Sequence, residues 1–163
     1  MSERQKPKRS RPNRRPKELG ILTDREIRRL LVGCEEFTRY PTRNKAIVLL
    51  ACEAGLTIRE ISRLWRGHIV DPTDAADARI EVYRSGAKNL LNRSIPMPRG
   101  TRLFRAVYAL LREVPGVPSD PLILSERAMR GEAAPDEDRY MRPTSIGYLF
   151  YRLYLKTGVK GSS

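Results

Sequence analysis

The sequence predicts a mainly α fold with one small β-hairpin. Apolar residues recur every three or four positions along most of the 163-residue chain, which is the spacing of an amphipathic helix. Only residues 79–84 alternate apolar and polar side chains as a strand does, and residues 92–98 can supply the return strand. With 40% hydrophobic and 31% charged residues, the chain suits one soluble globular domain with its own core.

Residues 1–18 precede this domain as a basic tail that we expect to be disordered. Residues 1–17 hold eight Lys and Arg against one Glu, which gives the tail +7 of the chain's net charge of +13. Three prolines interrupt the tail, and a charged segment of this kind has no reason to fold alone. It can neutralise DNA phosphates and release their counterions, or it can simply keep the protein soluble. The candidate DNA contacts in the tail are Arg9, Arg11, Arg14, Arg15 and Lys17.

Two Thr-x-x-Glu capping boxes mark helix starts in the first half of the domain. Thr23 and Glu26 open an amphipathic helix. Residues 43–54 are apolar nearly all round, which predicts a buried central helix that ends near Gly55. Thr57 with Glu60 then forms the second box and opens a short helix.

The second half combines the hairpin with further helices. Pro96 and Pro98 restrict the return strand to an edge or a strand end, because proline cannot donate a ladder hydrogen bond. The remaining pattern predicts a helix over 101–113, an extended link or short strand over 122–125, a flexible acidic loop over 131–139, and a helix over about 144–157 that Gly158 stops.

Several classes of function are disfavoured. One His and no Cys-x-x-Cys pair leave no legible metal site, so we expect neither a metal nor another cofactor. Cys34 and Cys52 lie among apolar residues and are expected to be buried, reduced thiols. No apolar run approaches the ~20 residues that span a bilayer, and no signal peptide is evident. We therefore expect a cytoplasmic protein, associated with the nucleoid if it binds DNA, and no membrane partner.

The stretch GLTIREISRLW, residues 55–65, resembles the first helix and turn of helix-turn-helix DNA readers. That motif needs a second helix after a short turn, to enter the major groove. The continuation contains Pro72 and three Asp residues, which resist a helix interior and repel phosphate. A DNA-binding transcriptional regulator of this type remains the alternative hypothesis.

The order of the segments resembles the catalytic domain of tyrosine recombinases, the phage-integrase family. The pieces that carry the resemblance are LTDREIRRLL, RNKAIVLLACEAGLTIREISRLWRGHI, KNLLNRSIPMP, LILS and TSIGYLFYRLYLKTGV. The resemblance covers about residues 19–163. The resemblance implies a partial tyrosine-recombinase catalytic-domain fold and a lineage of DNA integration and site-specific recombination in a mobile element.

The resemblance also implies which residues should carry the chemistry. In the family a Tyr attacks a DNA phosphodiester, two Arg and a His or Trp stabilise the developing charge, and a hairpin Lys protonates the leaving oxygen. The first Arg falls at Thr57, and Arg59 lies about 200° further round a helix. Lys88 matches the hairpin Lys, and Arg93 matches the Arg of the following strand. Lys88 is thus the residual catalytic candidate, and Lys88 and Arg93 are candidate DNA contacts.

The family's His-x-x-Arg box, its later His or Trp and its nucleophile would follow the last residue, Ser163. We expect Tyr148, Tyr151 and Tyr154 to be core or surface aromatics instead. The sequence thus predicts a double-stranded DNA-binding chain that is catalytically incomplete alone. The alternatives are one half of a split active recombinase, completed by a second chain, and a gene fragment without a selected role.

The same resemblance predicts incomplete burial. Further helices cover the core of the family beyond this point, so we expect the apolar faces around Ile146, Leu149 and Leu153, or their packing partners, to be partly exposed. Self-association, or binding of a complementary recombinase chain, would cover them.

Overall fold

The computed structural model of the chain describes residues 22–72, 77–83, 91–134 and 139–160. Arg93 is therefore the one sequence-predicted site residue that falls within this part of the chain. The other candidates lie outside the described residues: Arg9, Arg11, Arg14, Arg15, Lys17 and Lys88.

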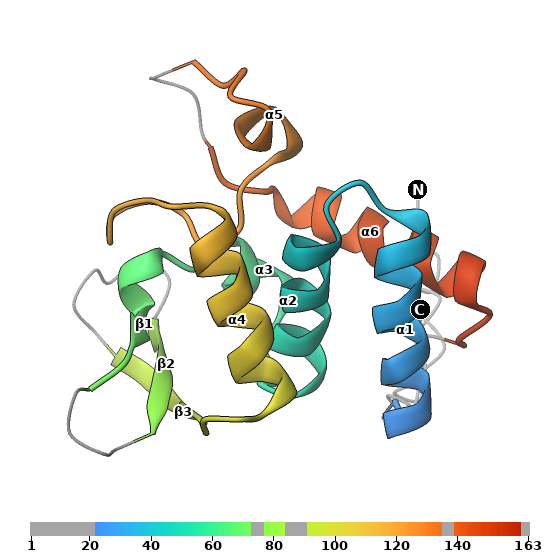
Figure 1. The fold of residues 1–163 in the computed structure, drawn as a ribbon, viewed down its shortest axis with the longest axis horizontal. Coiled ribbons are helices and arrows are strands. Elements are labelled where there is room, and N and C mark those ends of the chain that lie inside the picture. Colours follow the sequence, from blue (N-terminus) through green and yellow to red (C-terminus); the bar gives the residue numbers. More distant parts are fainter. Residues whose placement is uncertain (1–21, 73–76, 84–90, 135–138, 161–163) are drawn as a thin grey trace, which may run out of the picture.

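The described residues confirm the mainly α class with a small antiparallel sheet. In chain order the elements are α1 (Asp24–Phe37), α2 (Pro41–Cys52), α3 (Ile58–Ser62), the 3-10 turn η1 (Arg66–His68), β1 (Ile69–Val70), β2 (Ala78–Tyr83), β3 (Leu91–Met97), α4 (Arg102–Glu113), α5 (Glu126–Met129) and α6 (Pro143–Thr157). The sheet lies at one end of the molecule and α1 at the other, with α2 and α4 between them, while α5 projects from the body (Figure 1).

Local sequence signals set the helix ends. Both predicted capping boxes are confirmed, because the Thr23 and Thr57 side chains each accept a hydrogen bond from the backbone of the Glu three residues on, which bonds back. Helix α6 ends at Gly158, whose φ of 67° is the left-handed conformation that favours glycine at a helix C-terminus.

The sheet has one more strand than the predicted hairpin. Strand β2 lies in the centre and pairs antiparallel with both neighbours, so the order is β1-β2-β3. Pro96 lies opposite Arg79 on β3, an edge strand, as the prolines predicted. Strand β1 has only two residues, too few for an alternating pattern to reveal it.

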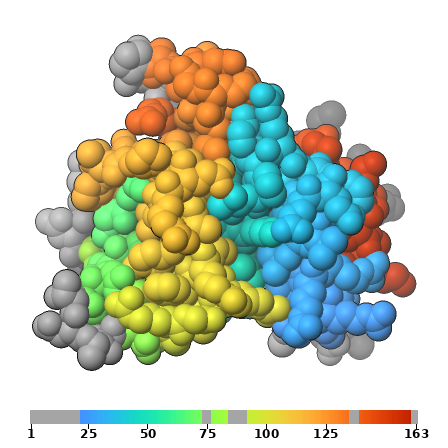
Figure 2. All heavy atoms as spheres, in the orientation of Figure 1, coloured from blue at the N-terminus to red at the C-terminus, as the bar shows by residue number. Residues whose placement is uncertain are grey.

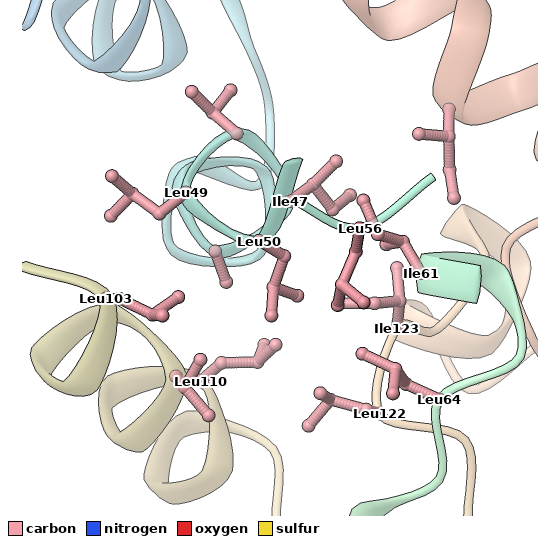
Figure 3. Close-up of a cluster of buried hydrophobic side chains, with 14 of the residues drawn as sticks. Ile47, Leu49, Leu50, Leu56, Ile61, Leu64, Leu103, Leu110, Leu122 and Ile123 are labelled. Carbon is pink, nitrogen blue, oxygen red and sulfur yellow. The ribbon is translucent and has the colours of Figure 1, made fainter. Parts of the chain in front are cut away.

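The core surrounds α2, as its apolar sequence predicted. Helix α2 packs against α1, α3, α4 and α6, and its side chains meet those of α4 and of the 122–123 link in the interior (Figure 3). The labelled core residues are Ile47, Leu49, Leu50, Leu56, Ile61, Leu64, Leu103, Leu110, Leu122 and Ile123. Arg39 in the α1–α2 turn and Thr144, Ser145 and Lys156 near the ends of α6 stay exposed.

The expected exposure of the three named residues of the α6 apolar face is wrong. Ile146, Leu149 and Leu153 are all buried, because α1, α2 and α3 pack against α6. Helix α1 approaches especially closely at Gly33, where an added Cβ would lie 2.5 Å from Cγ2 of Thr157. The chain therefore covers this face by itself.

The segment after α3 does not complete a helix-turn-helix. Among the described residues that follow α3, the chain enters the 3-10 turn η1 and then strands β1 and β2. The polar, proline-containing sequence after Trp65 thus prevents a recognition helix, as the residue types suggested. In the described part of the chain no helix is both long and apolar enough to cross a membrane.

Candidate nucleic-acid interface

The first candidate region is the corner formed by Thr57, Glu60 and Arg93. Thr57 Oγ1 accepts a hydrogen bond from the Glu60 backbone N–H at 3.3 Å, and the Thr57 N–H donates to Glu60 Oε2 at 2.8 Å. Arg93 reaches in from β3, and its Nη2 donates to the same Glu60 oxygen at 3.1 Å and to the Gly55 carbonyl at 3.3 Å. Two distant segments, α3 and β3, are thereby joined.

Arg93 keeps some capacity for an outside ligand. Its side chain is 41% exposed, and within the described residues only its Nη2 forms hydrogen bonds. Its Nε and Nη1 can still donate to a phosphate oxygen, since an arginine carries five N–H groups. Arg59, exposed on α3, makes no hydrogen bond to this corner within the described residues.

The second candidate region is a groove of about 950 Å³ between the α1–α2 turn, the start of α5 and one side of α6. Its charge is strongly one-sided, because the only acidic side chain among the described residues that line it is Glu126. The cations in the lining are Arg39, Arg43, Arg127, Arg142, Arg152 and Lys156. Hydroxyl groups of Ser125, Thr144 and Ser145 and the rings of Tyr140 and Tyr148 complete its polar and aromatic surface.

Arg43 forms part of this groove but is itself only 1% exposed. Its Nη1 donates to the Leu124 carbonyl at 2.9 Å and its Nε to Asn44 Oδ1 at 3.0 Å. Its Nη2 lies 3.9 Å from Glu126 Oε1, which is too long for a hydrogen bond. Burial lowers the pKa of Arg43 while Glu126 opposes that shift, and the guanidinium still stays protonated.

Four of the other cations, Arg39, Arg142, Arg152 and Lys156, make fewer polar contacts than Arg43 within the described residues. Arg39 lies over the Tyr40 ring at 5.6 Å, and Lys156 lies 6.0 Å from the Phe37 ring centroid. The Arg142 and Arg152 side chains make no hydrogen bond or ion pair within residues 22–72, 77–83, 91–134 and 139–160. The groove therefore presents positive charge that the described protein does not neutralise, which is suited to a polyanion.

The comparisons identify the fold. No protein-family model and no curated protein matches the chain. A crystal structure of XerA recombinase matches it with a TM-score of 0.59 at 23% identity, over 87% of this chain and 44% of that one. The chain has a recombinase-like fold. At this identity the similarity establishes the fold alone, and the chain spans less than half the length of that recombinase.

The groove of this recombinase-like chain was missed by sequence reasoning. Its cations come from positions 39 to 156, and only Arg152 and Lys156 share a helix face at the i, i+4 spacing that a sequence reveals. The buried Arg43 gave no signal, because arginine is normally exposed. His, Cys, Asp and Glu side chains of the described residues form no group of three or more that could hold a metal ion.

Proposed function

We propose that this recombinase-like chain binds double-stranded DNA, mainly through the phosphate backbone, and that it does not cleave DNA as a lone polypeptide. The observation that carries the proposal is the groove, where six cationic side chains face one carboxylate. Each cation that neutralises a phosphate releases condensed counterions, which supplies much of the free energy of DNA binding. Phosphate contacts of this kind position a duplex but do not read its sequence.

Arg43 supports the proposal through its burial. A charge held out of water interacts more strongly with an approaching anion than one at the surface, because the local dielectric constant is lower. Arg142 and Arg152 add charges without a described partner at the rim. Arg93 supplies a further phosphate contact at the Thr57 corner, and the basic tail and Lys88 extend the contacts beyond it.

The residue at the Thr57 corner supports the proposed catalytic incompleteness. The resemblance requires an arginine there, but Thr57 uses its hydroxyl to cap α3. Removing one donor that stabilises a developing oxyanion typically costs ~10²–10³ in rate. Among the described residues no general base is hydrogen-bonded to the Tyr148 or Tyr151 hydroxyl, and such a base is the partner that activates a tyrosine nucleophile.

The binding proposal is tested by salt dependence on a 20-base-pair duplex. We compare the parent chain with an Arg142→Gln/Arg152→Gln variant between 50 and 200 mM salt. The control, Arg105→Gln/Arg112→Gln, removes the same charge from exposed positions of α4. Helix α4 lies on the face shown in Figure 2, where α6 appears only at the edge. The groove variant should flatten the log–log slope by about 0.9 for each phosphate that it no longer neutralises. Equal slopes for both variants would contradict the proposal.

Deleting residues 1–17 tests the tail separately. Because this segment holds a net +7, its removal should lower duplex affinity and flatten the slope further, again by about 0.9 per phosphate. A deletion variant with the slope of the parent chain would make the tail a solubilising segment only.

A nicked suicide substrate tests catalytic incompleteness. The parent chain and a Thr57→Arg variant should both give no protein–DNA adduct on denaturing electrophoresis, because catalytic groups of this type act as a unit. An adduct that is absent in Tyr148→Phe or Tyr151→Phe would identify a nucleophile in α6 and overturn this part of the proposal.

A further inference from the structure

The side chains of two tyrosines on α6 are unusually exposed to solvent. The Tyr148 and Tyr151 side chains are 61% and 58% exposed, and their rings stack with centroids 6.3 Å apart and planes 29° apart. Tyr148 lines the basic groove. Their hydroxyls are not hydrogen-bonded within the described residues, so the structure supplies no internal role for the pair.

The charges beside the pair indicate what can cover it. Arg152 follows Tyr151 directly and shares a helix face with Tyr148 at the i, i+4 spacing. Lys156 lies one turn further along the same face, and no acidic residue occurs in α6. Pairing this face with a second copy would bring like charges together, which is unfavourable, whereas a polyanion is complementary to it.

We infer that Tyr148 and Tyr151 form a stacking platform for unpaired bases of a nucleic acid whose backbone lies in the groove. This inference rests on the proposed binding of nucleic acid by the groove. Every base has a π face that can stack on an aromatic ring, and cationic grooves with exposed aromatics are typical of single-strand binding. A duplex keeps its bases stacked on each other, so the pair acts only where strands are open.

The consequence is a preference for DNA that contains a single-stranded segment. Stacking contributes about 5- to 150-fold in affinity per base when measured by removal of the aromatic ring. The tyrosines should therefore add at least about 5-fold to single-strand affinity, and about 25-fold if both rings engage a base, while leaving duplex affinity unchanged.

The test uses the full chain and three probes: a 20-nucleotide oligo-dT strand with one central 2-aminopurine, a 20-base-pair duplex, and that duplex with a five-nucleotide gap. Affinity is measured by anisotropy and stacking by 2-aminopurine quenching. The Tyr148→Leu/Tyr151→Leu variant keeps apolar area but loses both rings, whereas Tyr148→Phe/Tyr151→Phe keeps them. Leu155→Ala is the matched control, because it removes a 65% exposed apolar side chain of the same helix but no ring.

The double Leu variant should lose at least about 5-fold on the single strand and the gapped duplex, lose the 2-aminopurine quenching, and keep its affinity for the intact duplex. The double Phe variant and Leu155→Ala should match the parent chain. Equal losses on all probes, or no loss on any, would overturn the inference; the second result would leave the tyrosines to a protein partner.

The outcome is separable from that of the proposed function. Suppose that Arg142→Gln/Arg152→Gln weakens duplex binding, but the double Leu variant loses the same affinity, or none, on all three probes. Only the base-stacking inference then fails. If the arginine changes alter no titration, the proposed function fails. Circular dichroism confirms folding, and the single Tyr148→Leu and Tyr151→Leu variants replace the double one if it does not fold.

Discussion

The Thr57 corner and the groove both contain arginines. The corner arginine has partners within the protein, whereas two of the groove arginines have none among the described residues. In the corner, Thr57 and Glu60 hydrogen-bond each other at the start of α3, and Arg93 on β3 donates to Glu60. In the groove, Arg142 and Arg152 project without any partner among the described residues. Polar groups that form hydrogen bonds or ion pairs within the protein stabilise its fold. Unpaired like charges repel one another, and binding of an anion from outside relieves that repulsion.

Arg43 combines the two situations. It lines the groove, yet its bond to the Leu124 carbonyl resembles that of Arg93 in the corner, because it joins α2 to a segment 81 residues away. The comparison therefore predicts that Arg43 contributes to stability, and that the exposed groove arginines contribute to binding alone.

The largest expected effect is that of Arg43→Ala on stability. Removing this buried side chain should lower the free energy of unfolding by about 3 kcal/mol, because the Leu124 carbonyl loses its donor and a cavity remains. Arg142→Gln, at the exposed rim, should change it by less than about 0.5 kcal/mol. Urea unfolding of both variants measures the difference, and equal small changes would group Arg43 with the rim.

A smaller effect is expected at the corner. Thr57→Ala removes the side chain that caps α3 and should cost about 1 kcal/mol, whereas Thr57→Ser keeps the hydroxyl and should cost much less. Thermal or urea unfolding distinguishes the two variants. If Thr57→Ala is neutral in stability but weakens duplex binding, the corner belongs with the groove as a ligand site.

The smallest expected effect on stability concerns His68, whose imidazole has partners within the protein. The Trp65 N–H donates to His68 Nδ1, and the imidazole packs 4.8 Å from the Tyr83 ring. Burial lowers the pKa of His68, and the negative charge of Glu81 opposes that shift only in part. The unfolded chain, in which a histidine has a pKa of about 6.5, therefore binds a proton more readily than the folded chain.

Stability should consequently decrease as the pH falls through about 6.5 toward the lower pKa of the folded state, and should not depend on His68 above that range. His68 is the only histidine of the chain, and urea unfolding at pH 7.5 and 5.5, compared between the parent chain and a His68 variant, measures its contribution. His68→Asn keeps an acceptor for the Trp65 N–H and should abolish the decrease. A decrease of the same size in this variant would assign it to other groups.

Local patterns in the sequence were sufficient to predict the longer helices and the hairpin. The capping boxes at Thr23 and Thr57, the apolar run of α2 and the glycine that ends α6 act on neighbouring backbone groups, so their effect can be recognised without the fold. The hairpin and its edge strand followed from alternation and from Pro96. Strand β1 and helix α5, two and four residues long, are too short to carry a period.

What the sequence determined by itself is therefore the longer helices and the hairpin, the mainly α class and the basic character of the chain. Only the tertiary structure decided which charges meet. Packing of α1, α2 and α3 on α6 buries Ile146, Leu149 and Leu153 and turns Tyr148, Tyr151 and Arg152 outward. It also gathers cations from positions 39 to 156 around one groove. Such contacts depend on the three-dimensional arrangement of distant segments, so the local periodicity of a sequence cannot predict them.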